Sequence, residues 1–137
     1  MLQYWLLKTE PGTYSFDQLS RDSSTHWNDV RNFQARNNLR KMTRDDLALI
    51  YHSGDEKAVV GIARVIREAY PDLDPEGGDW SQVDVQFVEK FKHPVTLAEI
   101  KRTESLQEIA LIKQSRLSVM PITSAHYETL LKLGGGS

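Results

Sequence analysis

Two β-rich runs separated by a short polar loop restrict the possible fold more than any other part of this sequence. Residues 47–52 (LALIYH) and 58–66 (AVVGIARVI) are mostly apolar and β-branched, and Gly54 lies in the loop between them. This pattern is typical of a β-hairpin with a longer loop, and its strands are expected at the centre of a sheet. Gly61 interrupts the second run, which predicts a bulge or the close approach of another group.

The rest of the chain predicts further short strands and short helices. Strands are expected at residues 3–7, 83–91 and 115–120, with Pro94 closing the second of them. Residues 21–25 and the acidic stretch 68–79 are expected to form loops. Helices are expected to follow the N-cap residues Ser15, Asn32, Thr96, Ser105 and Thr123 or Ser124. Because these helices are too short to connect parallel strands, the sequence favours an α+β fold, a small mixed and mostly antiparallel β-barrel surrounded by short helices.

Length and composition indicate one folded domain over residues 1–133, followed by a flexible Gly/Ser tail at 134–137. The chain has no cysteine, which excludes disulfides, thiolate zinc sites and cysteine nucleophiles. No apolar run approaches the roughly 18 residues of a membrane span. We therefore expect a soluble monomer without a membrane partner, in the cytoplasm, or in the nucleus of a eukaryote or on the nucleoid of a bacterium.

A cationic run interrupts this otherwise ordinary composition. Five basic residues and no acid occur between residues 31 and 44, although the formal net charge of the chain is -2. Three of the arginines recur every four residues and would share one face of a helix, while Phe33 and Leu39 would face inward. Such a stripe is usually a solvated helix face, but it also suits phosphate. The candidate phosphate-binding residues are Arg31, Arg36, Arg40, Lys41 and Arg44.

Eight segments follow one another in order over nearly the whole chain. They are YWLLKTEP (4–11), TYSFDQL (13–19), WNDVRNFQARNNLRKM (27–42), DLALIYHS (46–53), VVGIARV (59–65), AYPD (69–72), Trp80 with VDVQFVEKF (83–91), and SRLSVMPI (115–122). Together these segments resemble the EVE domain family of the PUA-like superfamily. Two positions depart from the family pattern, since Asp29 and Asp45 stand where the family usually has glycine, and this puts the local backbone there in question.

The resemblance implies a non-catalytic module that binds DNA or RNA and holds one flipped, modified base, without a cofactor. The base would be a modified cytosine such as 5-methyl- or 5-hydroxymethylcytosine in DNA, or a modified RNA base. The implied pocket residues are Lys8, Thr9, Glu10, Trp27, Asn28, Val30, Arg31, Asn32, Tyr51, His52, Ser53, Arg116, Leu117 and Ser118.

Elementary chemistry suggests roles for some of these residues. Trp27 and Tyr51 would supply flat stacking surfaces, and Glu10 would accept a hydrogen bond from the exocyclic amine of cytosine. Gly61 or Val30 would border a niche for the methyl group. His52 is the weakest member, because alternation along a strand turns it away if its neighbours face the pocket. Trp5 and Trp80 are expected in the core.

Two other functions stay open. The first is an enzyme acting on nucleic acid or modified nucleotides, for which the sequence contains no recognisable catalytic motif. The four histidines have no metal-ligand spacing, and no GxSxG elbow or P-loop occurs. A carboxylate pair near Glu10 would be compatible with catalysis. A protein-interaction module would instead use the acidic stretch 68–79 to bind a basic partner.

Overall fold

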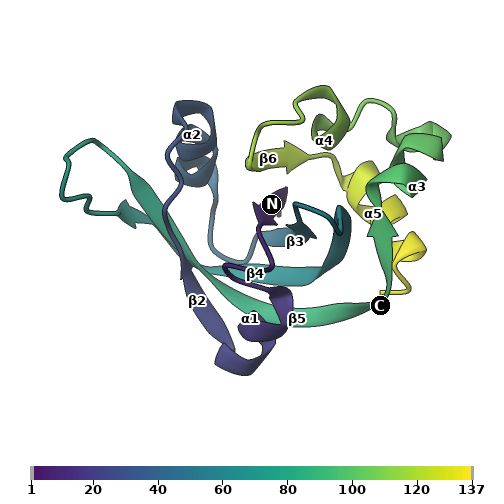
Figure 1. The fold of residues 1–137 in the computed structure, drawn as a ribbon, viewed down its shortest axis with the longest axis horizontal. Helices are drawn as coiled ribbons and strands as arrows, with labels where there is room; N and C mark the ends of the chain where they lie inside the picture. The colour runs from purple at the N-terminus through teal and green to yellow at the C-terminus, as the bar shows by residue number, and fades with distance from the viewer. Residues whose placement is uncertain (1, 137) are drawn as a thin grey trace.

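A computed structural model of the protein describes residues 2–136, which form a six-stranded sheet with short helices around it (Figure 1). The strands are β1 (Tyr4–Thr9), β2 (Ser24–Trp27), β3 (Leu47–His52), β4 (Ala58–Pro71), β5 (Ser81–Thr96) and β6 (Val119–Ile122). The helices are α1 (Phe16–Asp22), α2 (Phe33–Lys41), α3 (Leu97–Arg102), the 3-10 turn η1 (Glu104–Leu106), α4 (Ala110–Lys113) and α5 (Ser124–Leu133).

The predicted hairpin is the centre of the sheet. The strand order is β2-β5-β4-β3-β1-β6, so β3 and β4 lie in the middle and are buried over most of their length. The register shifts between Ile50 and Tyr51 and again between Val59 and Gly61, which confirms the expected irregularity. The Phe16 ring fills the space beside Gly61, where an added Cβ would lie 2.3 Å from Phe16 Cε2. The close neighbour of Gly61 is therefore a core side chain of α1, and the methyl niche proposed there has no room.

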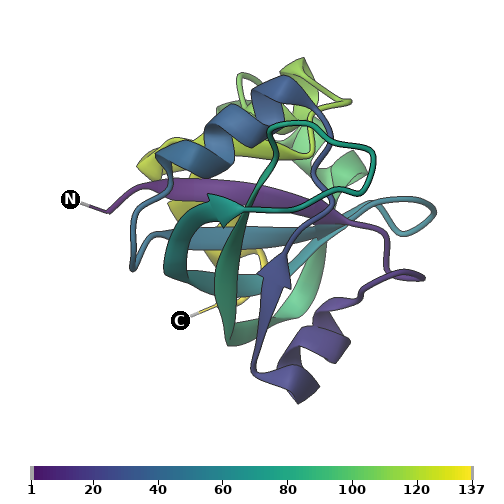
Figure 2. The ribbon, with the colours of Figure 1, turned by 90° about the vertical axis from the view of Figure 1, so that its left-hand side faces the viewer.

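The sheet is mixed and mostly antiparallel, as expected, but the prediction of a closed barrel is wrong. Only β1 and β3 pair in parallel among the described strands, and β2 and β6 end the strand order without pairing to each other. The sheet is strongly curled, so its two edges approach each other without joining (Figures 1 and 2). The loop expected at residues 21–25 overlaps the start of β2, because the polar residues Ser24 and Thr25 show no apolar alternation.

Local capping chemistry predicted the helix starts well. Ser15 caps α1, Asn32 caps α2, and Thr123 caps α5, each through a side-chain oxygen that accepts a backbone N–H. Thr96 caps α3 in the same way. The expected cap at Ser105 is wrong, because η1 occupies that stretch and α4 starts later without a side-chain cap.

Tertiary packing overrode several local signals. Phe33 was expected to face inward, yet it is 65% exposed. Trp80 was expected in the core, yet it lies half-buried against the Phe33 ring, with centroids 5.3 Å apart. Pro94 does not close β5, which bulges and continues to Thr96. Strand β6 starts at Val119, later than the expected 115.

The glycine-rich end, expected to be a flexible tail, packs against the body as far as Gly136. Gly134 N–H donates to the Leu130 carbonyl, and His93 N–H donates to the Gly134 carbonyl. A Cβ on Gly134 would lie 2.2 Å from the Phe91 ring. This end therefore continues the last turn of α5 onto β5.

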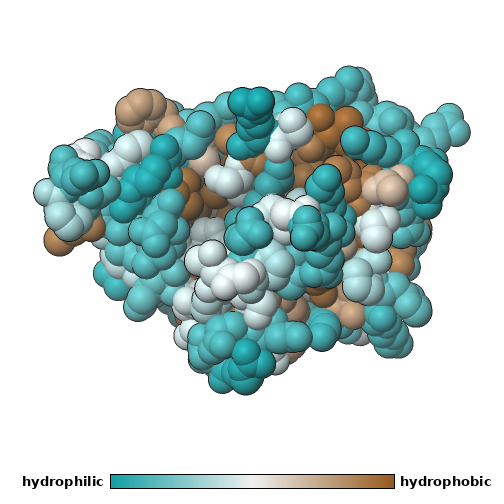
Figure 3. Space-filling view, viewed as in Figure 1, coloured by the Kyte–Doolittle hydropathy of each residue, from teal (hydrophilic) through white to brown (hydrophobic). Residues whose placement is uncertain are grey.

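The surface is mainly hydrophilic on the face seen in Figure 3, and apolar residues gather on the side of β6 and α4. Among residues 2–136, no helix is long and apolar enough to cross a membrane.

Candidate nucleic-acid interface

A pocket of about 420 Å³ lies in the open seam between the two edges of the curled sheet. Edge strand β2 supplies one wall, and β1, which lies next to the opposite edge strand β6, supplies the other wall. Ser118 joins β1 because Lys8 N–H donates to the Ser118 carbonyl at 2.9 Å, just before β6 begins. The lining residues are Lys8, Thr9, Thr13, Tyr14, Thr25, His26, Trp27, Asn28, Asp29, Val30, Arg31 and Ser118.

An aromatic corner forms the apolar part of the pocket. Trp27 ends β2 and is 8% exposed, and the Tyr14 ring stands perpendicular to it with centroids 6.4 Å apart. The Tyr14 hydroxyl donates to Asp22 at 2.9 Å, and the Thr9 hydroxyl donates to the Tyr14 carbonyl at 2.7 Å. Burial raises the pKa of Tyr14, so its phenol stays protonated at neutral pH. The corner is thus held by packing and by hydrogen bonds, which presents a fixed flat surface.

His26 places a positioned imidazole in the lining. Its Nδ1 lies 2.8 Å from Asp84 Oδ1 and 2.9 Å from the Tyr70 hydroxyl. The Tyr70 hydroxyl also donates to Asp84. Burial, followed by the hydrogen bond to Asp84, raises the pKa of Tyr70 to about 12. Asp84 therefore accepts from both neighbours and fixes the orientation of an imidazole whose side chain is 66% exposed.

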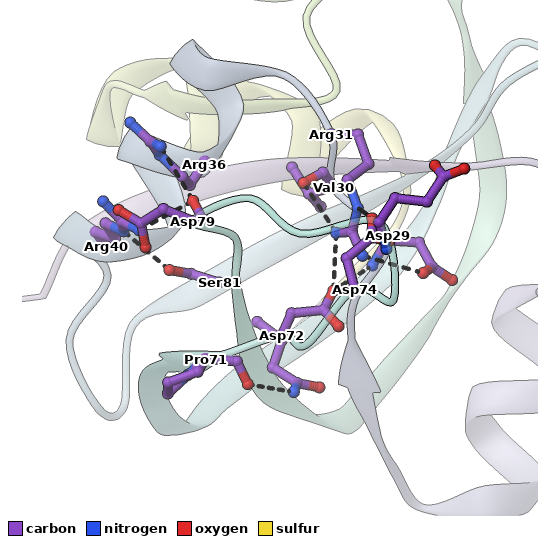
Figure 4. Close-up of polar contacts among 12 residues, drawn as sticks. Asp29, Val30, Arg31, Arg36, Arg40, Pro71, Asp72, Asp74, Asp79 and Ser81 are labelled. Atoms are coloured by element: carbon purple, nitrogen blue, oxygen red, sulfur yellow. Dashed lines mark hydrogen bonds and ion pairs between the residues drawn. The ribbon is translucent and has the colours of Figure 1, made fainter.

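The acidic loop, defined here as residues 72–80, fixes the rim of the pocket (Figure 4). Asp72 is buried, and one of its oxygens accepts from Asp29 N–H and from Arg31 Nη1, each at 2.9 Å. Arg31 Nε donates to Asp74 at 3.1 Å. The hydrogen bond to Asp72 raises the pKa of Arg31, so the guanidinium is a permanent charge. Asp29 adopts a left-handed φ of 62°, and its carboxylate is 86% exposed.

Half of the predicted pocket residues converge on this cavity. The structure brings together Lys8, Thr9, Trp27, Asn28, Val30, Arg31 and Ser118. The predicted residues that do not line it are Glu10, Asn32, Tyr51, His52, Ser53, Arg116 and Leu117.

Packing explains where the other residues lie. Tyr51 is buried in the core of β3 and, unlike Trp27, does not line the pocket, so it offers no stacking surface to a base there. His52 Nε2 accepts from Phe16 N–H at 3.0 Å, while Nδ1 lies 2.8 Å from Glu56, so the ring is a structural cross-link. The Glu10 carboxylate lies against Gly54.

Of the remaining four, Ser53 donates its backbone N–H to the Thr9 carbonyl at 2.9 Å, and the other three lie near α2. Asn32 is its N-cap, and it shares a separate groove of about 320 Å³ with Arg116 and Leu117. The expectation that the SRLS segment converges on the base pocket therefore holds only for Ser118.

Five lining residues were not predicted from the sequence: Thr13, Tyr14, Thr25, His26 and Asp29. Thr25 and His26 were missed because β2 was not expected. Tyr14 had a usable signal, since it is an aromatic residue only three positions after residues 8–11 (KTEP), which supply Lys8 and Thr9.

Arg36 and Arg40, the two stripe arginines on α2, face the acidic loop, which lies beside α2 in both ribbon views (Figures 1 and 2). Arg44 lies beyond α2, which ends at Lys41, so the three arginines do not share one helix face as expected. Arg40 donates to the Asp79 carboxylate at 2.7 Å and to Ser81 Oγ at 2.9 Å. Arg36 donates to the Asp79 backbone carbonyl at 3.0 Å. Lys41 and Arg44 form no side-chain ion pair with any described residue. The predicted phosphate-binding set is therefore divided between paired and unpaired cations.

Within residues 2–136, no group of three or more histidines and carboxylates is placed to hold a metal ion. Three of the four acids of the acidic loop, Asp72, Asp74 and Asp79, form ion pairs with arginines of the same chain, so most of the negative charge of this loop is already paired.

The chain matches the family model described as the EVE domain over residues 3–133. Thymocyte nuclear protein 1 of Gallus gallus is 35% identical, with 95% of this chain and 68% of that protein covered. A solved structure of a hypothetical protein from Leishmania major has a TM-score of 0.94 and 39% identity, covering 98% of this chain and 96% of that one. The human THYN1 protein, solved in complex with DNA containing 5-methylcytosine, has a TM-score of 0.89 and 32% identity, covering 98% of this chain and 99% of that one.

Proposed function

This chain belongs to the EVE domain family, and on that premise we propose that it is a non-catalytic module that binds nucleic acid and holds one flipped, modified base. The observation that carries the proposal is the pocket in the sheet seam, with the Trp27 and Tyr14 rings on one side and polar groups around them. The likeness to a human protein solved with 5-methylcytosine DNA supports a modified cytosine as the ligand.

The size and chemistry of the pocket suit a single base. Its volume of about 420 Å³ falls in the range of small-ligand sites. A base stacked on Trp27 gains binding energy that hardly depends on its identity, so selection must come from the edge contacts. The Asn28 amide and the Ser118 hydroxyl can donate to ring acceptors. The exposed Asp29 carboxylate replaces Glu10 as acceptor for the exocyclic amine of cytosine.

The cations around the pocket suit the phosphates on either side of the flipped base. Arg31 lines the pocket and is permanently charged, and Lys8 reaches the lining from β1. Burial lowers the pKa of Lys8, and its ammonium donates to the Ser115 carbonyl at 2.6 Å. Phosphate contacts of this kind position the strand without reading its sequence, and they weaken with salt.

The proposal is tested by fluorescence anisotropy with two oligonucleotides that differ only in one 5-methyl group on cytosine. We expect the methylated strand to bind about tenfold more tightly, as is typical of one methyl group in a fitted apolar niche. Asn28→Ala should weaken the binding of both strands, because they share the ring acceptors that the Asn28 amide contacts, whereas Thr129→Ala on α5, outside the pocket lining, should leave both affinities unchanged. Equal affinity of the wild-type protein for both strands would contradict the proposal.

One observation favours a second candidate, an enzyme acting on modified nucleotides. The His26 and Asp84 pair resembles a general base with its orienting carboxylate. Chromatography of modified nucleotides and oligonucleotides after incubation with the protein distinguishes the two functions. A binding module returns them unchanged, while an enzyme releases a product, and this release is lost in His26→Ala.

A further inference from the structure

A stacked aromatic pair at the surface, formed by Phe33 and Trp80, has no role in the pocket described above. Phe33 is the first residue of α2 and is 65% exposed. Its ring lies nearly parallel to the Trp80 ring, at an interplanar angle of 14° and a centroid distance of 5.3 Å. Exposing a phenylalanine ring to water forfeits the free energy that its burial would provide. One face of Phe33 is thus taken by Trp80, and most of the remaining ring surface is open.

Arg36 stands beside this pair with an uncompensated charge. Its guanidinium carbon is 5.0 Å from the Phe33 centroid and 6.0 Å from the Trp80 centroid. A guanidinium over the outer face of Phe33 would lie much farther from Trp80, so Arg36 flanks the stack and leaves that face open. Its hydrogen-bond acceptors are the Asp79 carbonyl and the Asn37 side-chain amide, which are both neutral. Arg31 and Arg40, by contrast, are paired with carboxylates.

The pair is continuous with the pocket through Arg31. This residue lines the pocket, and its guanidinium carbon lies 5.4 Å from the Trp80 centroid. A strand with one base in the pocket and its phosphate near Arg31 therefore leads toward Trp80 and Phe33. An open aromatic face next to an uncompensated cation matches the two parts of a nucleotide, a flat base and a phosphate. It matches a basic or purely apolar protein partner less well.

We propose that the outer face of Phe33 is a second stacking subsite, which takes an unpaired base flanking the one in the pocket, with the adjoining phosphate on Arg36. This inference rests on the proposed function and extends the interface beyond the base pocket. Stacking there is indifferent to base identity. The subsite therefore contributes affinity, and the pocket contributes selectivity.

The test measures the affinity of single-stranded oligonucleotides with and without one 5-methylcytosine. Phe33→Leu keeps an apolar residue but removes the flat ring, and we expect it to weaken both strands by about tenfold while the ratio between them is preserved. Phe33→Tyr should retain wild-type affinity. Leu73→Ala, which truncates an 88% exposed apolar side chain in the neighbouring acidic loop, is the matched control and should change nothing.

Removing the flanking base that would stack on Phe33 tests this stacking contact separately from the rest of the interface. With abasic sites on both sides of the 5-methylcytosine, the wild-type protein and Phe33→Leu should bind equally well. Arg36→Gln should weaken binding to intact strands and flatten its salt dependence.

Different results would contradict the stacking subsite and the proposed function of the base pocket. If Phe33→Leu binds intact strands as tightly as wild type, or loses as much affinity on the abasic strand, the subsite is wrong and the pocket proposal is untouched. If the wild-type protein does not distinguish the methylated strand, the proposed function fails. Tenfold weakening by Phe33→Leu would still demonstrate the stacking contact in that case.

Discussion

At the scale of single residues, Asp29 and Asp45 have the same backbone conformation with different surroundings. Both adopt a left-handed φ, 62° for Asp29 and 77° for Asp45, where the family pattern suggests glycine. Aspartate tolerates this region better than most residues, but its Cβ still costs free energy there. The two positions keep the backbone that glycine would have, and only Asp29 adds a carboxylate to the pocket rim.

We predict that Asp29→Gly stabilises the fold and impairs base selection. The free energy of unfolding, measured by urea titration, should rise by about 0.5–1 kcal/mol because the strain at positive φ is removed. The preference for 5-methylcytosine over thymine at the same place in a strand should fall, since the acceptor for the cytosine amine is lost. Asp45→Gly is the matched control and should stabilise without changing binding. An unchanged cytosine preference in Asp29→Gly would exclude Asp29 as the acceptor.

At the scale of elements, the acidic loop forms ion pairs with α2 and with Arg31, which precedes α2. Asp79 pairs with Arg40, but the Asp79 side chain is 80% exposed and Arg40 is 36% exposed, so water weakens this ion pair. The Asp72 and Arg31 pair is better shielded, since their side chains are 11% and 29% exposed. The loop therefore anchors the pocket rim firmly and covers the middle of the arginine stripe only loosely. A phosphate could replace Asp79 more readily than Asp72.

We predict that Asp79→Asn strengthens nucleic-acid binding with little effect on stability. Loss of an exposed ion pair should change the free energy of unfolding by less than about 1 kcal/mol. Freed Arg40 should make one further phosphate contact, so the slope of log K against log salt should steepen by about 0.7 for a single strand. Glu76→Gln removes the same charge from the same loop without freeing an arginine. Equal salt slopes in the two variants would show that Arg40 makes no phosphate contact.

At the scale of the whole molecule, one buried carboxylate links the start of the sheet to the turn before β3. Asp46 is fully buried and accepts hydrogen bonds from the Gln3 and Thr43 backbones, from the Trp5 indole at 2.9 Å and from the Thr43 hydroxyl at 2.8 Å. Burial alone would raise the pKa of Asp46, but these donors outweigh it and hold the pKa below its ordinary value. The folded state therefore favours the ionised form.

This linkage predicts an acid-sensitive contribution to stability. Because the folded-state pKa of Asp46 is lowered, its contribution is complete above about pH 4, the ordinary aspartate value, and is lost as the pH falls through the folded-state pKa. Asp46→Asn should lower the free energy of unfolding at pH 7 by about 3 kcal/mol, and the deficit should shrink at low pH. Asp55→Asn, on the exposed loop before β4, is the control for charge alone. An equal deficit at pH 7 and at pH 3 would contradict this role of ionised Asp46.

The sequence by itself determined those features that depend on neighbouring residues. The cap oxygens of Ser15, Asn32 and Thr123 act over three residues, and the hairpin pattern of 47–66 needs only a short loop, so these elements were predicted correctly. The family motifs also indicated where one wall of the pocket lies, because residues 27–31 form one continuous segment that lines it. The contacts that these residues make with distant parts of the chain were not predicted.

Only the tertiary structure decided what depends on distant parts of the chain. Phe33 packs on Trp80 and Arg40 pairs with Asp79, which lie 47 and 39 residues further along the chain, and no periodicity within α2 indicates these contacts. Tyr51 and His52 resemble site residues in sequence, yet long-range packing buries one and cross-links the other. The curl of the sheet likewise depends on every strand pairing at once, and it is this curl, stopping short of closure, that leaves the seam in which the pocket lies.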